Sequence, residues 1–432
     1  MKKYLAIVSV FVVMCRQQTG NNPPTAPIVP FGADTGYLNV AYTFTSSAID
    51  PDDDSIMIRF DWGDGDTSEW SHRIISGDTI SMQHLYSNAG IYHIKAQAKD
   101  IYGALSGWSK AHKIVIIATW EKLFGGIDDE RGIFVKQTDD GGYIVVGYTF
   151  SYGGGGQDLL LIKIDATGNI EWYKTFGGIQ WDCGFSLCLT DDGGFALVGY
   201  TESYGAGDKD IWLIKTDANG NEEWNKTFGD TAKDYGNSIC KTSDGGFIIT
   251  GYTTSYGAGG KDVWLIKTDA NGNKEWDKTF GGAYYEEGCC VAPATDGGFV
   301  VAGVTASQGA GGEDVWLIKL DTDGNMEWNK TYGGIDDDWG WTVCQTSDDG
   351  FFIVCRTYSY GAGGRDIWII KTDNNGNVEW NKTFGGTDYD AGYCGWQTKD
   401  GGYVIVGYTY SYGAGGSDVW ILKTDSKGNI SY

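Results

Sequence analysis

Six carboxylates recur every 52 residues along most of the chain. They are Glu130, Asp182, Asp234, Glu286, Asp338 and Asp390. Carboxylates brought together in one place repel each other unless a cation, water or a lysine relieves the repulsion. Oxygen ligands of this kind are also those that Ca²⁺ prefers, so calcium is a candidate cofactor. The series predicts either a cation site at the mouth of a central channel or a set of structural ties, and both interpretations stay open.

A second recurring series is aromatic. It contains Tyr152, Tyr204, Tyr256, Tyr360 and Tyr412, with Gln308 in the fourth copy, and Trp339 adds a ring beside the fifth carboxylate. Aromatic rings stack on apolar ligand faces, while hydroxyls and carboxylates make hydrogen bonds that orient the ligand. These residues therefore predict a face that binds a saccharide or a protein ligand such as a basic peptide.

Catalytic constellations are scarce in the repeated part. No histidine follows His112, which excludes Ser-His-Asp and Cys-His devices and His-ligated metals there. A glycosidase needs two carboxylates about 5–10 Å apart in a pocket. Near-identical copies do not favour an active site, so we expect no catalytic residues. The departures from the repeat are Val304, Gln308, Cys355 and Arg356, in copies four and five, and they mark either a site or drift.

The elements that must position these residues form a unit of 52 residues. Tryptophan marks the same position in every copy, at Trp120, Trp172, Trp224, Trp276, Trp328 and Trp380. Each copy contains four short hydrophobic stretches separated by Gly-, Asp- and Asn-rich turns, which is typical of a propeller blade. If the Trp strand is outermost, the strand at Trp120 completes the last blade and leaves no exposed edge. The sequence thus predicts an all-β fold with a closed six-bladed β-propeller over residues 120–432.

Two short patterns in the repeats resemble known propellers. The segment 164–172 and its copies resemble the tryptophan-docking turn of quinoprotein-type propellers. The pattern D-G-G-[FY] followed by G-Y-T-x-S resembles bacterial and archaeal surface propeller repeats. These resemblances imply a surface location but no particular ligand.

A different domain is predicted over residues 28–118, where several alternating strands indicate a β-sandwich. The motifs Asp61-Trp-Gly-Asp-Gly, His84-Leu-Tyr and Gly90-Ile-Tyr resemble a polycystic-kidney-disease (PKD) domain. The resemblance implies an immunoglobulin-like sandwich that presents or binds rather than catalyses. The acidic turn Asp50–Asp54 is either a second calcium candidate or a solvated turn.

The N-terminus predicts export. Two lysines and an apolar run precede Cys15, so residues 1–15 form a signal peptide. The residues before Cys15 resemble a bacterial lipoprotein box, although Met14 stands where that box has a small residue. Lipidation of Cys15 and ordinary cleavage nearby are both open. Residues 16–27 are expected to be a linker, and the location is the cell envelope or the extracellular space.

The net charge of the chain narrows the classes of possible binding partner further. The chain has 32 basic and 57 acidic residues, a net charge of −25, which disfavours nucleic acid and anionic membrane surfaces. Membrane contact is expected only through a lipid anchor, and we expect a monomer. None of the eight later cysteines forms a C-x-x-C pair, so buried free thiols are expected.

Overall fold

The computed structural model describes residues 20–117, 121–413 and 416–430, and all of its regular elements are strands. The predicted signal peptide, Cys15 and Trp120 lie outside these residues. No helix that could cross a bilayer occurs in the described ranges. The chain divides into two compact units, one ending at Glu121 and the other beginning at Lys122.

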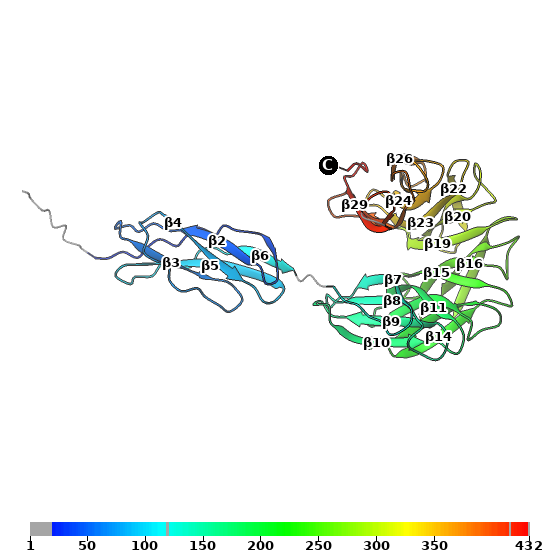
Figure 1. Cartoon of the computed structure of the whole chain (residues 1–432), viewed down its shortest axis with the longest axis horizontal. Coiled ribbons are helices and arrows are strands. Elements are labelled where there is room, and N and C mark those ends of the chain that lie inside the picture. The colour runs from blue at the N-terminus through cyan, green and yellow to red at the C-terminus, as the bar shows by residue number, and fades with distance from the viewer. Residues whose placement is uncertain (1–19, 118–120, 414–415, 431–432) are drawn as a thin grey trace, which may run out of the picture. The chain divides into compact units, whose positions relative to one another are not determined.

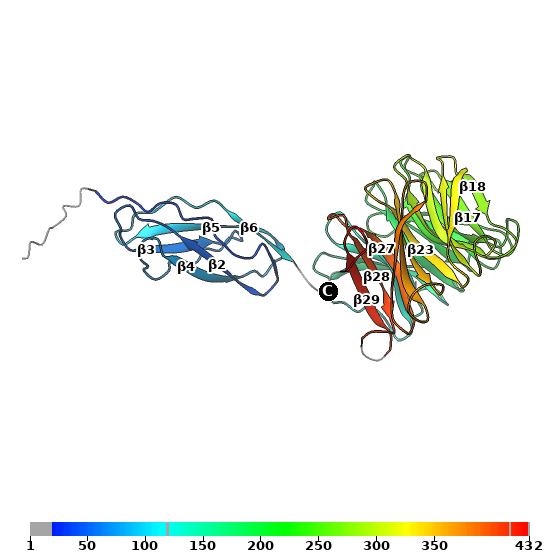
Figure 2. The ribbon, with the colours of Figure 1, turned by 90° about the horizontal axis from the view of Figure 1, so that it is seen from above.

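The N-terminal unit consists of two sheets around one core (Figures 1 and 2). One sheet has the order β1-β6-β5-β3, and the other pairs β2 with β4. The strands are β1 (Thr35–Tyr37), β2 (Ala41–Ser47), β3 (Ile56–Asp61), β4 (Thr79–Leu85), β5 (Gly90–Asp100) and β6 (His112–Ile117). Phe44 of one sheet packs with Phe60 and Ile94 of the other, because alternate residues of each strand point inward. The predicted sandwich-type packing of sheets is present.

Part of the predicted linker is joined to this unit. The backbone N–H of Thr25 donates to the Ile49 carbonyl at 2.8 Å, and that of Asn22 donates to Asp52 at 2.8 Å. The side chain of Asn21 donates to Asp100 at 2.6 Å. The contacts of the unit therefore begin before residue 28, where the sequence placed its start.

The C-terminal unit contains six separate antiparallel sheets in chain order. The first five have four strands and the sixth has three. Their strands are β7 (Glu130–Gln137), β8 (Tyr143–Thr149), β9 (Asp158–Ile164) and β10 (Ile170–Phe176); β11 (Asp182–Leu189), β12 (Phe195–Thr201), β13 (Asp210–Thr216) and β14 (Glu222–Phe228); β15 (Asp234–Lys241), β16 (Phe247–Thr253), β17 (Asp262–Thr268) and β18 (Lys274–Phe280); β19 (Glu286–Pro293), β20 (Phe299–Thr305), β21 (Asp314–Leu320) and β22 (Met326–Tyr332); β23 (Asp338–Gln345), β24 (Phe351–Thr357), β25 (Asp366–Thr372) and β26 (Val378–Phe384); and β27 (Asp390–Gln397), β28 (Tyr403–Thr409) and β29 (Asp418–Thr424).

Consecutive sheets pack face to face and share apolar cores. Between the second and third sheets the core includes Ile211, Leu213, Ile249 and Trp264. The same pattern joins the other neighbours. Figure 1 shows the first strand of each sheet nearest a common centre and the fourth strand at the periphery. Both faces of an inner sheet are buried, so every residue of its second and third strands is buried, as in β16 and β17.

The period-marking tryptophans fit against a turn of the next sheet. A Cβ placed at Gly220 would lie 2.5 Å from the Trp172 ring, and Gly220 has φ +73°, a conformation that glycine adopts without strain. The same pairing joins Trp224 to Gly272 and Trp276 to Gly324. The predicted packing of these rings between neighbouring copies is thus present.

The sixth sheet lacks a fourth strand among the described residues (Figure 2). Residues 121–129 form no strand, so the predicted pairing of the Trp120 segment with β29 is not observed. Val419 is 76% exposed, whereas Val315 at the same repeat position is 0% exposed because it packs against the following sheet. The structure shows six consecutive sheets but no closed ring.

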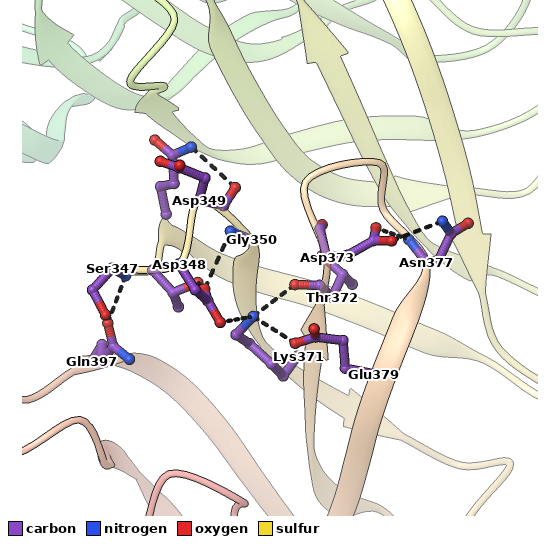
Figure 3. Close-up of polar contacts among 12 residues, drawn as sticks. Ser347, Asp348, Asp349, Gly350, Lys371, Thr372, Asp373, Asn377, Glu379 and Gln397 are labelled. Carbon is purple, nitrogen blue, oxygen red and sulfur yellow. Dashed lines mark hydrogen bonds and ion pairs between the residues drawn. The ribbon is translucent and has the colours of Figure 1, made fainter.

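A buried lysine on the third strand ties each of the first five sheets together. Lys371 contacts Asp348 at 3.0 Å and Glu379 at 2.8 Å, and its ammonium group donates to its neighbour's backbone carbonyl (Figure 3). Lys163, Lys215, Lys267 and Lys319 make the same pair of ionic contacts. In the sixth sheet Lys423 has one such carboxylate, Asp400.

We expect Lys319→Met to lower the free energy of unfolding by about 1–3 kcal/mol, because it leaves two carboxylates without their cation. The cost stays moderate because both carboxylates remain partly hydrated. The Lys319 side chain is 5% exposed, while that of Lys423 is 47% exposed. Lys423→Met is therefore the matched control and should cost less. Urea unfolding measures both variants, and an equal loss in the two would contradict the role assigned to burial.

Candidate functional site

All six recurring carboxylates are tied within their own repeat. Each accepts a hydrogen bond, at 2.7–3.1 Å, from the backbone N–H four residues earlier. In four repeats a serine from the loop after the second strand also donates to the carboxylate, as Ser359 does to Asp338 at 2.7 Å. In the other two, Thr149 and Thr305 donate to Glu130 and Glu286. Each carboxylate thus joins the turn before the first strand to the loop after the second.

At Glu130 these hydrogen bonds favour the ionised carboxylate. Burial raises the pKa of Glu130, but hydrogen bonds from Ser151, the Gly126 backbone and Thr149 outweigh it and lower the pKa to about 2. No three of the six carboxylates bring their oxygens within 4.8 Å of one another. The hydrogen bonds are those that the structural interpretation of the series expects.

The recurring tyrosines are tied in a similar way. The hydroxyl of Tyr204 donates to the Gly177 carbonyl at 3.0 Å, and its ring lies 5.4 Å from that of Trp212. The hydroxyls of Tyr152, Tyr256, Tyr360 and Tyr412 make the same bond to the equivalent glycines. These rings are partly exposed, but each hydroxyl already has a partner in its own repeat.

One cavity lies where the fourth, fifth and sixth sheets meet, and Trp339 lines it. Its volume is about 560 Å³, and loops before β21, β23, β25 and β27 supply most of its walls. Its lining comprises Glu313, Ile335, Asp336, Asp337, Trp339, Arg356, Tyr358, Gly363, Gly364 and Tyr389. The wall thus combines aromatic rings, carboxylates and a guanidinium group, which is the mixture expected of a site for a polar ligand with apolar faces.

Strand pairing sets the floor of this cavity. Trp339 on β23 pairs directly with Arg356 on β24, which brings the two side chains together across the strands. The Arg356 guanidinium carbon lies 4.2 Å from the Trp339 ring centre and 5.2 Å from that of Trp341. Cation–π contact of this kind holds a planar cation against a ring without neutralising it.

A partly buried acid lies beside these groups. Burial is the main cause that raises the pKa of Glu313, while a hydrogen bond from Trp339 lowers it. Its backbone N–H donates to Asp337 at 3.0 Å. Glu313 can therefore accept a hydrogen bond from a ligand hydroxyl or, when protonated, donate one.

Of this set the sequence brought Trp339 forward as a candidate, with Asp336, Asp337 and Tyr389 as neighbours of the recurring carboxylates, and Arg356 was noted as a departure from the repeat. Glu313, Tyr358 and Tyr389 come from three different repeat positions, so no single series contains them. The usable signal was the local loss of repetition in copies four and five, because identical repeats cannot build a one-sided cavity.

The eight cysteines between Cys183 and Cys394 are all free in the structure; Cys183, Cys188 and Cys355 are buried, and the other five are partly buried. Burial raises the pKa of the Cys188 thiol to about 12, so it is held as an unreactive thiol. In the N-terminal unit His84 contacts Asp64 at 2.6 Å and stacks on Trp62. That arrangement is a packed structural cluster.

The acidic turn of the N-terminal unit has the geometry of a cation site. Asp50, Asp52 and Asp54 each place a carboxylate oxygen within 4.8 Å of the others, the only such group of His, Cys, Asp and Glu in the described ranges. Asp50 is 1% exposed, and its Oδ2 atom has no hydrogen-bond partner. Burial and the charge of Asp50 raise the pKa of Asp54. A bound Ca²⁺ ion offsets the repulsion between these carboxylates and coordinates the oxygen atom that has no hydrogen-bond partner.

Comparisons with known proteins give similarity over parts of the chain. No family model matches the chain, and no curated protein matches it. A PKD domain of an M14-like peptidase from Thermoplasmatales archaeon SCGC AB-540-F20 is 32% identical, with 22% of this chain covering 98% of that one, at a TM-score of 0.21.

Two further structures cover more of the chain at lower identity. A eukaryotic initiation factor is 10% identical over 82% of this chain and 87% of its own, with a TM-score of 0.29. The extracellular domain of a hybrid two-component system from B. thetaiotaomicron is 13% identical over 92% of this chain and 51% of its own, with a TM-score of 0.31. The TM-scores of these three structures are all below 0.5, so none of them indicates the function of this chain.

We expect Ca²⁺ to raise the thermal midpoint of the N-terminal unit in the intact protein, because a divalent cation relieves the repulsion between the three aspartates. Asp50→Asn should reduce this stabilisation, while the exposed turn variant Asp78→Asn should keep it. Calorimetry with Ca²⁺ and after chelation measures the effect. An unchanged midpoint in the wild-type protein would show that the turn holds no calcium.

Proposed function

We propose that this is an exported surface protein whose C-terminal unit binds a saccharide in the cavity at Trp339. The observation that carries the proposal is the 560 Å³ cavity, whose wall joins aromatic rings with carboxylates and an arginine. The Tyr389 ring is about half exposed and stands at the cavity rim, where a sugar ring can stack on it. A protein ligand inserting a polar loop is the alternative within the same class.

The proposal includes a closed six-bladed propeller and a PKD-type N-terminal domain. The five interfaces between consecutive sheets of the C-terminal unit are already buried. The segment from Trp120 to Phe124 has the W-x-K-x-F pattern of Trp172–Phe176, which includes most of the fourth strand of the first sheet. Pairing of that segment with β29 would complete the sixth sheet, and packing of the first sheet against the sixth would cover Val419 and Ile421.

The surface location rests on sequence. The predicted signal peptide and the lipoprotein-like residues at Cys15 support export and attachment to the envelope. The competing role is a surface scaffold that binds no ligand. That role does not explain the mixed aromatic and charged lining of the cavity at Trp339.

The same cavity also favours a second candidate, an enzyme of glycosidase type. Glu313 has a raised pKa and shares the cavity with Asp337, and two carboxylates in different environments are what such an enzyme needs. Release of reducing ends from a bound oligosaccharide, lost in Glu313→Gln, would favour the enzyme. Binding without release favours the binding module that we propose.

We expect Tyr389→Ala to weaken binding of an array-selected oligosaccharide by about 5- to 50-fold, the effect of losing one stacked ring. Trp181→Ala is the matched control, since Trp181 is an exposed ring at the same repeat position in the second repeat and does not line the cavity. It should bind like the wild type. Titration calorimetry measures both, and equal losses in the two variants would place the ligand elsewhere.

A further inference from the structure

Two arginines beside the cavity have no acidic partner. Among the described residues, no carboxylate lies within ion-pair distance of Arg356 or Arg365, although the chain carries a net charge of −25. Lysines near the centre behave differently, since Lys209 contacts Glu202 at 3.1 Å and Lys261 contacts Glu287 at 3.6 Å. Two guanidinium groups without a carboxylate partner therefore lie close together near this cavity.

Aromatic rings hold both guanidinium groups in place. Arg356 packs against Trp339 and Trp341, and Arg365 lies 5.9 Å from the ring centres of both Tyr358 and Tyr389. Arg365 also donates a hydrogen bond to the Tyr408 hydroxyl. The rings fix the orientation of each cation but supply no negative charge.

Hydrogen-bonding capacity is left over on both side chains. The Nε atoms of Arg356 and Arg365 are buried and have no hydrogen-bond partner. Burial lowers the pKa of Arg356, and the positive charge of Arg365 lowers it further, because the two cations repel each other. Such a pair is stabilised by an anion that accepts hydrogen bonds from it.

Building on the proposed function, we propose that the ligand is a carboxylated saccharide whose carboxylate is bound by Arg356, with Arg365 adding positive potential. The planar guanidinium group matches the two oxygens of a carboxylate. Trp339 and Tyr389 contact the sugar ring, and Glu313 accepts a hydroxyl hydrogen bond.

The nearby acids favour a singly charged group over a more highly charged one. Glu313, Asp336 and Asp337 line the same cavity, so a phosphate monoester, with nearly two negative charges, meets more repulsion than a carboxylate does. The combination of one firm cation site with acidic walls also suits the hydroxyl groups of a sugar. The chemistry thus selects a uronate or another carboxylated sugar unit.

The test compares oligosaccharides that contain uronate or sialate units with their methyl esters, which keep the shape and remove the charge. The purified wild-type chain should bind the acid forms about 10- to 100-fold more tightly than the esters. Arg356→Gln should remove most of that difference and leave ester binding within about 3-fold of wild type. Arg131→Gln is the control, because Arg131 is the exposed third arginine of the repeats.

Each outcome separates this inference from the proposal beneath it. Equal binding of acids and esters by the wild-type chain overturns the inference and leaves saccharide binding intact. Preference for sulfated or phosphorylated sugars over carboxylated ones also overturns it. Binding of no saccharide at all overturns the proposed function itself. The wild-type comparison decides the matter even if Arg356→Gln fails to fold.

Discussion

The structure of the C-terminal unit depends on the burial of both faces of each sheet. A four-stranded sheet with two hydrophobic faces is stable only if something covers each face, because apolar surface left in water costs about 25 cal/mol per Å². In this protein the neighbouring repeat is the cover, so Leu213 and Leu265 are fully buried at equivalent positions. The same requirement explains why the tryptophans recur, since each fills the space between two sheets.

Repetition also limits where function can reside. The tie of the Asp338 carboxylate recurs in all six repeats and that of the Tyr360 hydroxyl in five, so their recurrence reflects the structure of the repeat. A ligand needs an asymmetric surface, and asymmetry arises only where copies differ. The cavity at Trp339 meets that condition because Arg356 replaces the tyrosine found in four other copies.

Much of the fold could be predicted from the sequence, because glycine and asparagine recur at the turns of each repeat and tryptophan recurs at the packing positions between sheets. The candidate site was harder to predict. The recurrence of Glu130 and its equivalents predicted a candidate cation site. A carboxylate that binds a backbone N–H cannot be distinguished by sequence from one that binds a ligand. Glu313, Tyr358 and Tyr389 are distant in sequence and meet only through the packing of the sheets. Their proximity could not be seen from any single series.

Closure of the C-terminal unit requires that the free edge of β29 is paired in the folded protein, and the Trp120–Phe124 segment is the proposed partner strand. Hydrogen–deuterium exchange of the intact chain tests this most directly. We predict that amides of 419–422 exchange about as slowly as those of 367–370 in β25, and that Lys122→Pro, which removes a ladder hydrogen bond, speeds them selectively. Fast exchange at 419–422 in the wild-type chain would contradict closure, and so would slow exchange that Lys122→Pro leaves unchanged.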